Sequence, residues 1–263
     1  MSDRVGSRLA AHRSSRAFDR PIIVIDIHCH ILPEVDDGPK SWEIAVAMCR
    51  MAAADGIEHM VATPHSNDRY FYDREYLSGL LQDLQQRIGD RPKLGLGCDF
   101  HLSLENMQAA LVMPEKYRIG NSRYLLVEFS NFGVPAQIDE WFGQMVELGT
   151  RPIITHPERN PILQQTGERV LEWVKRGCAV QVTASAITGF WGAKVRDTAH
   201  WLLKEKAVHF LATDAHDTTR RPPVLSEARK VVAKQFGEDL AEALVEGNPK
   251  AVVDDHLLAC FTE

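Results

Sequence analysis

Seven short apolar runs recur along the chain, each ending in polar residues and each followed by a segment with helically spaced apolar side chains. This alternation constrains the fold most, because short strand–helix–strand connections form right-handed crossovers between parallel strands. The predicted strands span residues 22–27, 57–63, 93–98, 123–127, 151–155, 178–183 and 207–212. The predicted helices lie between Ser41 and Gly56 and over residues 73–88, 103–111, 136–148, 161–176, 191–206, 223–236 and 238–258.

Strands that are apolar throughout predict a parallel sheet covered on both faces. An open doubly wound sheet is compatible with this pattern, but a TIM-like barrel fits it better, because polar residues follow nearly every strand. No internal repeat or linker interrupts residues 21–263. We therefore expect a single α/β domain over residues 21–263, preceded by an arginine-rich N-terminal tail, residues 1–20, that we expect to be mobile.

The composition narrows the class of protein. A formal net charge of −6 argues against a broad nucleic-acid surface, although it leaves room for a small basic pocket. No apolar stretch reaches the roughly 18–20 residues needed to cross a bilayer. The 5 cysteines include no C-x-x-C pair, which favours reduced thiols and a cytoplasmic location over a disulfide framework.

The first strand ends in a pair of histidines, His28 and His30. Side chains two residues apart on an extended chain share one face, so both imidazoles can reach one ion. Asp36 and Asp37 follow in the next loop. Such a histidine pair is also common as a hydrogen-bonded, partly buried feature, so the rest of the chain has to decide between the two interpretations.

Other histidines and carboxylates follow most of the remaining strands. The candidate metal ligands are His28, His30, Asp37, His65, Asp99, Glu128, His156, Asp214 and His216. So many ionisable groups on one edge of a sheet would be costly without cations to neutralise them. Nine candidates exceed the three or four protein ligands of one ion, which indicates two or three ions. Ligation by histidine and carboxylate without cysteine suits Mn, Fe or Zn.

Seven motifs of the chain, taken in order, resemble those of the polymerase-and-histidinol-phosphatase (PHP) superfamily. They are HxH, VDDGP, TPH, an acid after the third strand, VEFS, ITHPER and TDAH…RRPP. Within this superfamily, the chain is most similar to the bacterial metal-dependent protein-tyrosine phosphatases of capsular and exopolysaccharide synthesis. The resemblance covers about residues 22–225. It implies a distorted (β/α)7 barrel, a trinuclear centre usually active with Mn2+, and a tyrosine autokinase with a Tyr-rich tail as substrate.

The resemblance also implies which residues bind each ion. His28, His30 and Asp214 would bind the first ion, and Glu128 and His156 the second, with Asp99 bridging the two. Asp37, His65 and His216 would bind the third. The family usually has Glu at the position of Asp99, which is one methylene shorter, so the bridge and the metal preference are in doubt at this position.

Two arginines, Arg159 and Arg221, follow strand-end motifs. They are either solvated loop charges or, as the resemblance implies, the catalytic groups that bind the substrate phosphate; guanidinium groups bind phosphate in a bidentate manner. His216 could supply a proton to the leaving group. The aromatic residues Tyr70, Phe71 and Tyr72 either form a rim for the substrate ring or belong to the core.

Several other functions remain as alternatives. A small-molecule phosphatase, for example one acting on histidinol phosphate, occurs in the same superfamily. A non-catalytic phosphotyrosine-binding module would keep the fold without metal, and a metal-dependent amidohydrolase is disfavoured because no lysine at a strand end is placed to bridge metals. Cysteine-based phosphotyrosine hydrolysis is excluded, since no cysteine has an arginine six residues later.

Overall fold

The computed structural model describes residues 22–261 as an α/β unit, so the predicted tail, residues 1–20, lies outside the described residues. The strands are β1 (Val24–Cys29), β2 (Ile57–Ala62), β3 (His65–Ser66), β4 (Lys93–Leu96), β5 (Asp99–His101), β6 (Tyr124–Glu128), β7 (Arg151–Thr155), β8 (Ala179–Thr183) and β9 (Phe210–Ala212). All paired strands are parallel. The single α/β domain with parallel sheets that the sequence predicts is therefore confirmed for this part of the chain.

The strands form two sheets, in the orders β1-β2-β4 and β3-β5-β6-β7-β8-β9. Two strands lie beyond the ends of the predicted strands 57–63 and 93–98 and were not predicted: β3 follows β2 after two residues, and β5 follows β4 after two residues. Between β4 and β5 stands Gly97, where a Cβ atom would lie only 3.1 Å from the side chain of Ile119. The other seven strands correspond to the seven predicted runs.

The two sheets meet at both of their edges. On one side, β2 and β4 lead directly into β3 and β5 of the other sheet, and Gly97 N donates to Ala62 O at 2.8 Å between the ends of β4 and β2. On the other side, His30 N donates to Ala215 O and Asp214 N donates to His28 O, each at 2.8 Å. The chain after β9 thus lies directly beside the end of β1, which brings the first and last strand-end motifs together.

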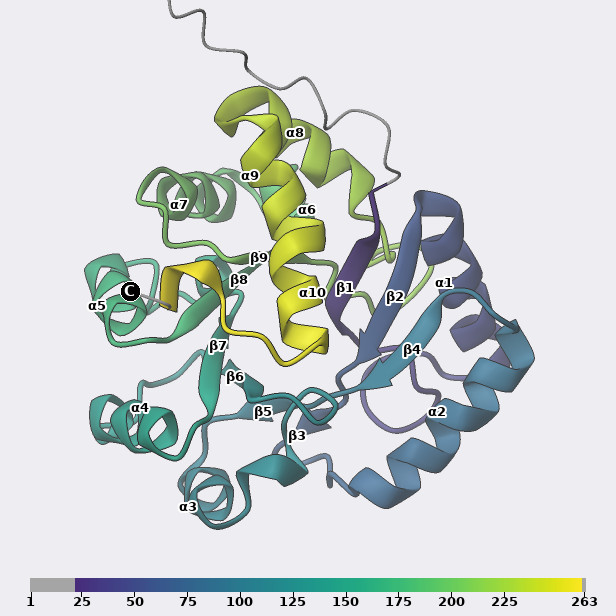
Figure 1. Cartoon of the computed structure of the whole chain (residues 1–263), viewed down its shortest axis with the longest axis horizontal. Helices are drawn as coiled ribbons and strands as arrows, with labels where there is room; N and C mark the ends of the chain where they lie inside the picture. Colours follow the sequence, from purple (N-terminus) through teal and green to yellow (C-terminus); the bar gives the residue numbers. More distant parts are fainter. Residues whose placement is uncertain (1–21, 262–263) are drawn as a thin grey trace, which may run out of the picture.

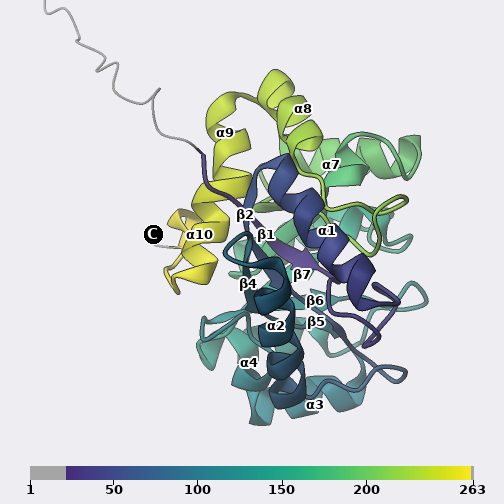
Figure 2. The same ribbon diagram turned by 90° about the vertical axis from the view of Figure 1, so that its right-hand side faces the viewer.

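Helices lie outside the strands (Figure 1). They are α1 (Trp42–Asp55), α2 (Arg74–Ile88), α3 (Leu104–Val112), α4 (Ile138–Glu147), α5 (Gly167–Lys175), α6 (Ala184–Ile187), α7 (Ala193–Lys204), α8 (Ser226–Phe236), α9 (Glu238–Glu242) and α10 (Asn248–Val253). They are completed by the 3-10 turns η1 (Pro114–Lys116), η2 (Pro157–Arg159) and η4 (Ala259–Phe261), and by the π-helical segment η3 (Ala243–Gly247), which joins α9 to α10. Helices α1 and α2 pack against β2 and β4 respectively and against each other (Figure 2).

Three helices begin at residues whose side chains cap them. Ser41 Oγ accepts from the backbone N–H of Ile44 at 3.4 Å, and Asp73 Oδ1 accepts from that of Tyr76 at 3.1 Å. Ser103 caps α3 in the same way. Each cap satisfies a donor that the first helical turn would otherwise leave without a partner.

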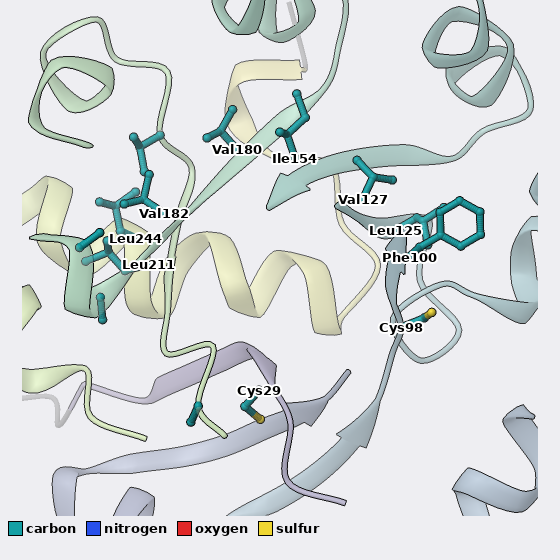
Figure 3. Close-up of a cluster of buried hydrophobic side chains, with 14 of the residues drawn as sticks. Cys29, Cys98, Phe100, Leu125, Val127, Ile154, Val180, Val182, Leu211 and Leu244 are labelled. Carbon is teal, nitrogen blue, oxygen red and sulfur yellow. The ribbon is translucent and has the colours of Figure 1, made fainter. Parts of the chain in front are cut away.

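Alternate residues of the strands face two different apolar clusters. Leu125 and Val127 of β6 point towards the helices, together with Val180 and Val182 of β8 (Figure 3). Leu126 belongs to a second cluster, which is covered by the C-terminal segment through Val252 and Leu258. The period of two follows from the pleat of an extended chain.

On the face of the sheet that bears this second cluster, the side chains change from apolar to polar towards the carboxyl ends of the strands. In β7, Ile153 is apolar and Thr155 is polar; in β8, the same change separates Ala179 from Gln181. In β6, Glu128 stands two residues after Leu126. Strand periodicity therefore places the polar groups together at one end of this face.

Several predicted boundaries are wrong. The first strand ends at Cys29, not Ile27, so His28 is inside it. Helix 161–176 begins only at Gly167, because Asn160 Oδ1 accepts the backbone N–H groups of Ile162 and Leu163 in a turn. The last predicted helix ends at Val253, not residue 258. Within residues 22–261, no helix has the length and apolarity to cross a membrane.

Candidate metal centre

The structure brings all nine predicted ligands to the carboxyl ends of the strands. His28 Nε2 lies 3.5 Å from Asp99 Oδ2 and 3.5 Å from Asp214 Oδ1. His30 Nε2 lies 3.5 Å from the same oxygen of Asp214 and 4.0 Å from Asp99 Oδ2. The two imidazoles of the HxH pair therefore face the same two carboxylates, as one shared ion would require.

The remaining ligands extend the cluster in two directions. Asp37 Oδ1 lies 3.4 Å from His65 Nε2 and 3.2 Å from His216 Nε2. On the other side, Glu128 Oε1 lies 3.7 Å from His156 Nε2 and its Oε2 lies 3.6 Å from His65 Nδ1. Asp37 is the most exposed of the carboxylates, with 49% of its side chain accessible, so this end of the cluster opens to solvent.

Three groups of these residues hold their ligand atoms within 4.8 Å of one another. They are His30, Asp37, His65 and His216; His28, His30 and Asp99; and His65, Asp99 and Glu128. In the described part of the chain, buried nitrogen and oxygen atoms of the cluster lack hydrogen-bond partners, namely His28 Nε2, His30 Nε2, His65 Nδ1 and both carboxylate oxygens of Asp99. Buried polar atoms are normally paired, so the donor set fits metal ions.

The electrostatics of the cluster are dominated by burial and by these carboxylates. Burial lowers the pKa of His28, but Asp99 and Asp214 outweigh it and raise this pKa to about 9. Burial and the neighbouring His216 lower the pKa of His30 to about 4, although Asp36 opposes them. The surroundings thus shift the pKa values of the two neighbouring imidazoles in opposite directions, and cations bound at this cluster would compete with protons for the ring nitrogens.

Two ligands occupy backbone conformations that L-residues rarely adopt. His156 has φ 32° and Asp214 has φ 50°, both in the left-handed region. His156 directly follows β7, and Asp214 lies two residues after the end of β9. At both places the chain turns sharply towards the site. Such strain is commonly found at functional sites.

Both predicted arginines reach the cluster. Arg159 and Arg221 form ion pairs with the same oxygen, Oδ2, of Asp214. Burial raises the pKa of that carboxyl, but the two arginines outweigh it and hold the pKa well below its usual range. The interpretation of these arginines as solvated loop charges is therefore wrong.

The aromatic triplet after β3 divides between the two predicted alternatives. The Tyr70 ring stacks on His65 with centroids 6.0 Å apart. Phe71 is 84% exposed. Tyr72 is buried and donates from its hydroxyl to Gly97 O at 2.9 Å, so it belongs to the core.

Two residues outside the predicted ligand set, one of them the Asp36 noted after the HxH motif, hold the two histidines of this motif. Asp36 Oδ2 lies 2.7 Å from His30 Nδ1, and Gln181 Oε1 lies 2.9 Å from His28 Nδ1. In both rings, the nitrogen bonded in this way leaves Nε2 facing the cluster. A polar residue inside an apolar strand, as in the AVQVT run of β8, was the available signal for Gln181.

Residues 24–254 match the family model described as capsular polysaccharide synthesis, CpsB/CapC. The chain is 34% identical to CapC of Staphylococcus aureus over 232 residues, covering 85% of this chain and 89% of that protein. It is 30% identical to the tyrosine-protein phosphatase CpsB of Streptococcus pneumoniae over 244 residues, covering 89% of this chain and all of that protein.

The chain is also similar to solved structures. A crystal structure from the study of YwqE from Bacillus subtilis and CpsB from Streptococcus pneumoniae, described as unique metal-dependent tyrosine phosphatases, matches with a TM-score of 0.84 and 28% identity. The match covers 89% of this chain and 96% of that one. The phosphotriesterase homology protein of Escherichia coli matches with a TM-score of 0.60 at 10% identity, a likeness of fold alone.

Proposed function

Because the chain belongs to the CpsB/CapC family of capsular polysaccharide synthesis, we propose that it is a metal-dependent protein-tyrosine phosphatase. It hydrolyses the phosphate ester of phosphotyrosine on protein. The observation that carries this proposal is the set of buried, unpartnered imidazole and carboxylate atoms beside two arginines. A metal-free binding module would not require this donor set, and the family match favours phosphotyrosine over a small-molecule ester.

We propose three metal positions. His28, His30 and Asp214 would hold the first ion, and Glu128 and His156 the second, with Asp99 placed to contribute to both. Asp37, His65 and His216 would hold the third. The distances between these groups support the assignment, and the ligand set of nitrogen and oxygen suits Mn2+, with Fe or Zn as alternatives.

Bound metal ions would supply positive charge and an activated water for attack on phosphorus. The residues of the chain itself orient the substrate: Arg159 and Arg221 converge on one point, where Asp214 Oδ2 accepts from both. A phosphate group offers several acceptor oxygens to the same donors. The arginines thereby hold the ester in line and balance the charge that develops on its oxygens.

The leaving phenolate of tyrosine has a pKa near 10, so it needs less help from an acid than an alkoxide does. His216 is the candidate proton donor. Its Nδ1 lies 3.0 Å from the carbonyl oxygen of Asp214 and its Nε2 lies 3.2 Å from Asp37 Oδ1. When Nδ1 donates its proton to the carbonyl oxygen, only Nε2 is left to bind a metal ion or to transfer a proton. Because a nitrogen bound to metal carries no proton, Nε2 can do only one of these at a time.

We also propose the finer features that the family resemblance implies. The strands make a distorted (β/α)7 barrel, which the hydrogen bonds between the two sheets support. The substrate is the Tyr-rich tail of a bacterial tyrosine kinase that controls polysaccharide synthesis. The protein acts in the cytoplasm, a location that the free thiols of all five cysteines support.

The experiment is metal analysis by mass spectrometry on purified protein, paired with hydrolysis of p-nitrophenyl phosphate, a phosphotyrosine peptide and histidinol phosphate. We expect two or three ions per chain and peptide hydrolysis that a chelator abolishes and Mn2+ restores. His156→Ala and Asp37→Ala should each remove most of this activity. Bound metal with turnover of histidinol phosphate alone would overturn the proposal in favour of a small-molecule phosphatase.

A further inference from the structure

The indole of Trp191 lies beside the metal cluster without belonging to it. Trp191 is half-buried in the turn between α6 and α7. Its Nε1 donates to Ser185 Oγ at 2.9 Å, and the ring of Phe190 meets it edge-on at 5.3 Å between centroids. A ring held by a directional hydrogen bond and an edge contact has a defined orientation.

Both arginines of the site contact this one ring. The guanidinium carbon of Arg159 lies 4.2 Å from the centroid of Trp191, and that of Arg221 lies 5.7 Å from it. Arg159 comes from the turn after β7 and Arg221 from the loop after β9, so no local backbone geometry holds them together. Trp191 also lines a cavity of about 210 Å³ together with Glu128, His156 and Arg159.

Two guanidinium groups at one place repel each other, and Asp214 is their only shared carboxylate among the described residues. A carboxylate that also binds metal has less negative charge to offer them. The face of an indole attracts cations and remains available when Asp214 is engaged elsewhere. The ring therefore supplies a second common partner for both arginines.

We propose that Trp191 is a positioning residue that holds Arg159 and Arg221 convergent on the phosphate of the substrate, and that Ser185 fixes the ring for this purpose. The inference rests on the proposed phosphatase function and deepens it. Ser185, a possible nucleophile by residue type alone, thereby has a structural role in phosphate binding. The recognised group is a phosphate monoester dianion, and the aromatic ring acts through the arginines rather than on the reacting atoms.

Four variants test this proposal in the full-length, Mn-loaded protein. Trp191→Leu keeps apolar bulk without an aromatic face, Trp191→Phe restores the face without the N–H group, and Ser185→Ala releases the ring. Trp42→Leu is the matched control, because Trp42 stacks with Arg87 at 4.4 Å outside the site. We measure inorganic phosphate binding by calorimetry, KM and kcat on a phosphotyrosine peptide, and Mn content.

We expect Trp191→Leu to weaken phosphate binding and raise KM by about fivefold, the size of a partly buried cation–π contact, with Mn content unchanged and kcat changed less than KM. Trp191→Phe should recover most of the lost phosphate affinity, Ser185→Ala should give an affinity between those of Trp191→Leu and the wild type, and Trp42→Leu should match the wild type.

The inference would be overturned if Trp191→Leu and Trp191→Phe bound phosphate equally, or if neither changed the phosphate affinity. Should a Trp191 variant not fold, Ser185→Ala decides. Wild-type protein without peptide hydrolysis contradicts the phosphatase function instead, whereas the phosphate titration still reports on Trp191.

Discussion

The carboxylate of Asp36 contacts the ring nitrogen of His30 that points away from the metal cluster. Its Oδ2 lies 2.7 Å from Nδ1, while Nε2 of the same ring faces Asp99 and Asp214. The same carboxylate accepts from the backbone N–H of Gly38 at 2.9 Å. A Cβ atom at residue 38 would lie 2.8 Å from the carbonyl oxygen of His30, so this turn requires glycine. The VDDGP loop thus orients one candidate ligand, His30, and carries another, Asp37.

We predict that Asp36→Asn lowers Mn2+ affinity by about 10- to 100-fold, the usual effect of losing a carboxylate behind a ligating histidine. The neutral amide is a weaker acceptor and can present its NH2 group to Nδ1 instead. A Mn2+ titration by calorimetry measures the change. Glu34→Gln, which removes an exposed charge from the same loop, is the control and should bind Mn2+ like the wild type. Equal affinities in both variants would contradict the prediction.

A second prediction concerns Gln181, which is fully buried and accepts from His28 Nδ1 at 2.9 Å. Gln181→Leu keeps similar volume but leaves that nitrogen without a partner, so the ring loses its preferred tautomer. We expect Mn2+ affinity to fall by about tenfold. Gln108→Leu, at an exposed position on α3, serves as the comparison in the same titration. A Gln181→Leu protein that binds Mn2+ as tightly as this comparison would show that the bond is dispensable.

The clustering of the candidate ligands could be predicted from the sequence because it depends on local order. Each ligand follows or ends an apolar strand, and parallel strands bring their carboxyl ends to one edge. Most strands and helices could likewise be located from the spacing of their apolar residues, which repeats every two residues in a strand and every 3.6 in a helix. Seven strand-and-helix units were therefore visible, whereas the short elements β3, β5 and α6 were not predicted.

The residues behind the ligands could not be predicted in this way. Gln181 and His28 are 153 positions apart, and their contact depends on the pairing of strands rather than on local pattern. The breaks at residues 63–64 and 97–98 likewise follow from the passage between two sheets. The split of Tyr70 and Tyr72 between site and core depends on which neighbours the loop meets.

A third prediction addresses Asp99, where the resembled family usually has Glu. Asp99 is fully buried, and neither of its carboxylate oxygens has a hydrogen-bond partner among the described residues. Asp99→Asn keeps the shape but removes the charge that two ions would share, so we expect at least one ion fewer per chain and a loss of peptide hydrolysis of about 100-fold or more. Asp99→Glu keeps the charge and should retain its ions. Metal content by mass spectrometry distinguishes the two variants, and full occupancy in Asp99→Asn would exclude a bridging role.

The last prediction concerns acid stability and a histidine outside the site. His209 is buried before β9, and its Nδ1 accepts from the backbone N–H of Val180 at 3.1 Å. Burial lowers the pKa of His209 from 6.5 to about 4. Above pH 6.5 the ring is neutral in both the folded and the unfolded chain, so its contribution to stability is fully present there.

Between pH 6.5 and pH 4 the unfolded chain takes up a proton that the folded chain does not, so stability falls as the pH falls. The loss attributable to His209 should reach about 2 to 3 kcal/mol at pH 4.5. His209→Asn cannot titrate, so its free energy of unfolding should fall less over this window, although it starts lower because packing is lost. Urea unfolding of both proteins at several pH values, with a chelator present throughout, measures the difference. Because the two proteins share all their other titrating groups, parallel curves would mean that His209 becomes protonated in the folded chain as readily as in the unfolded one.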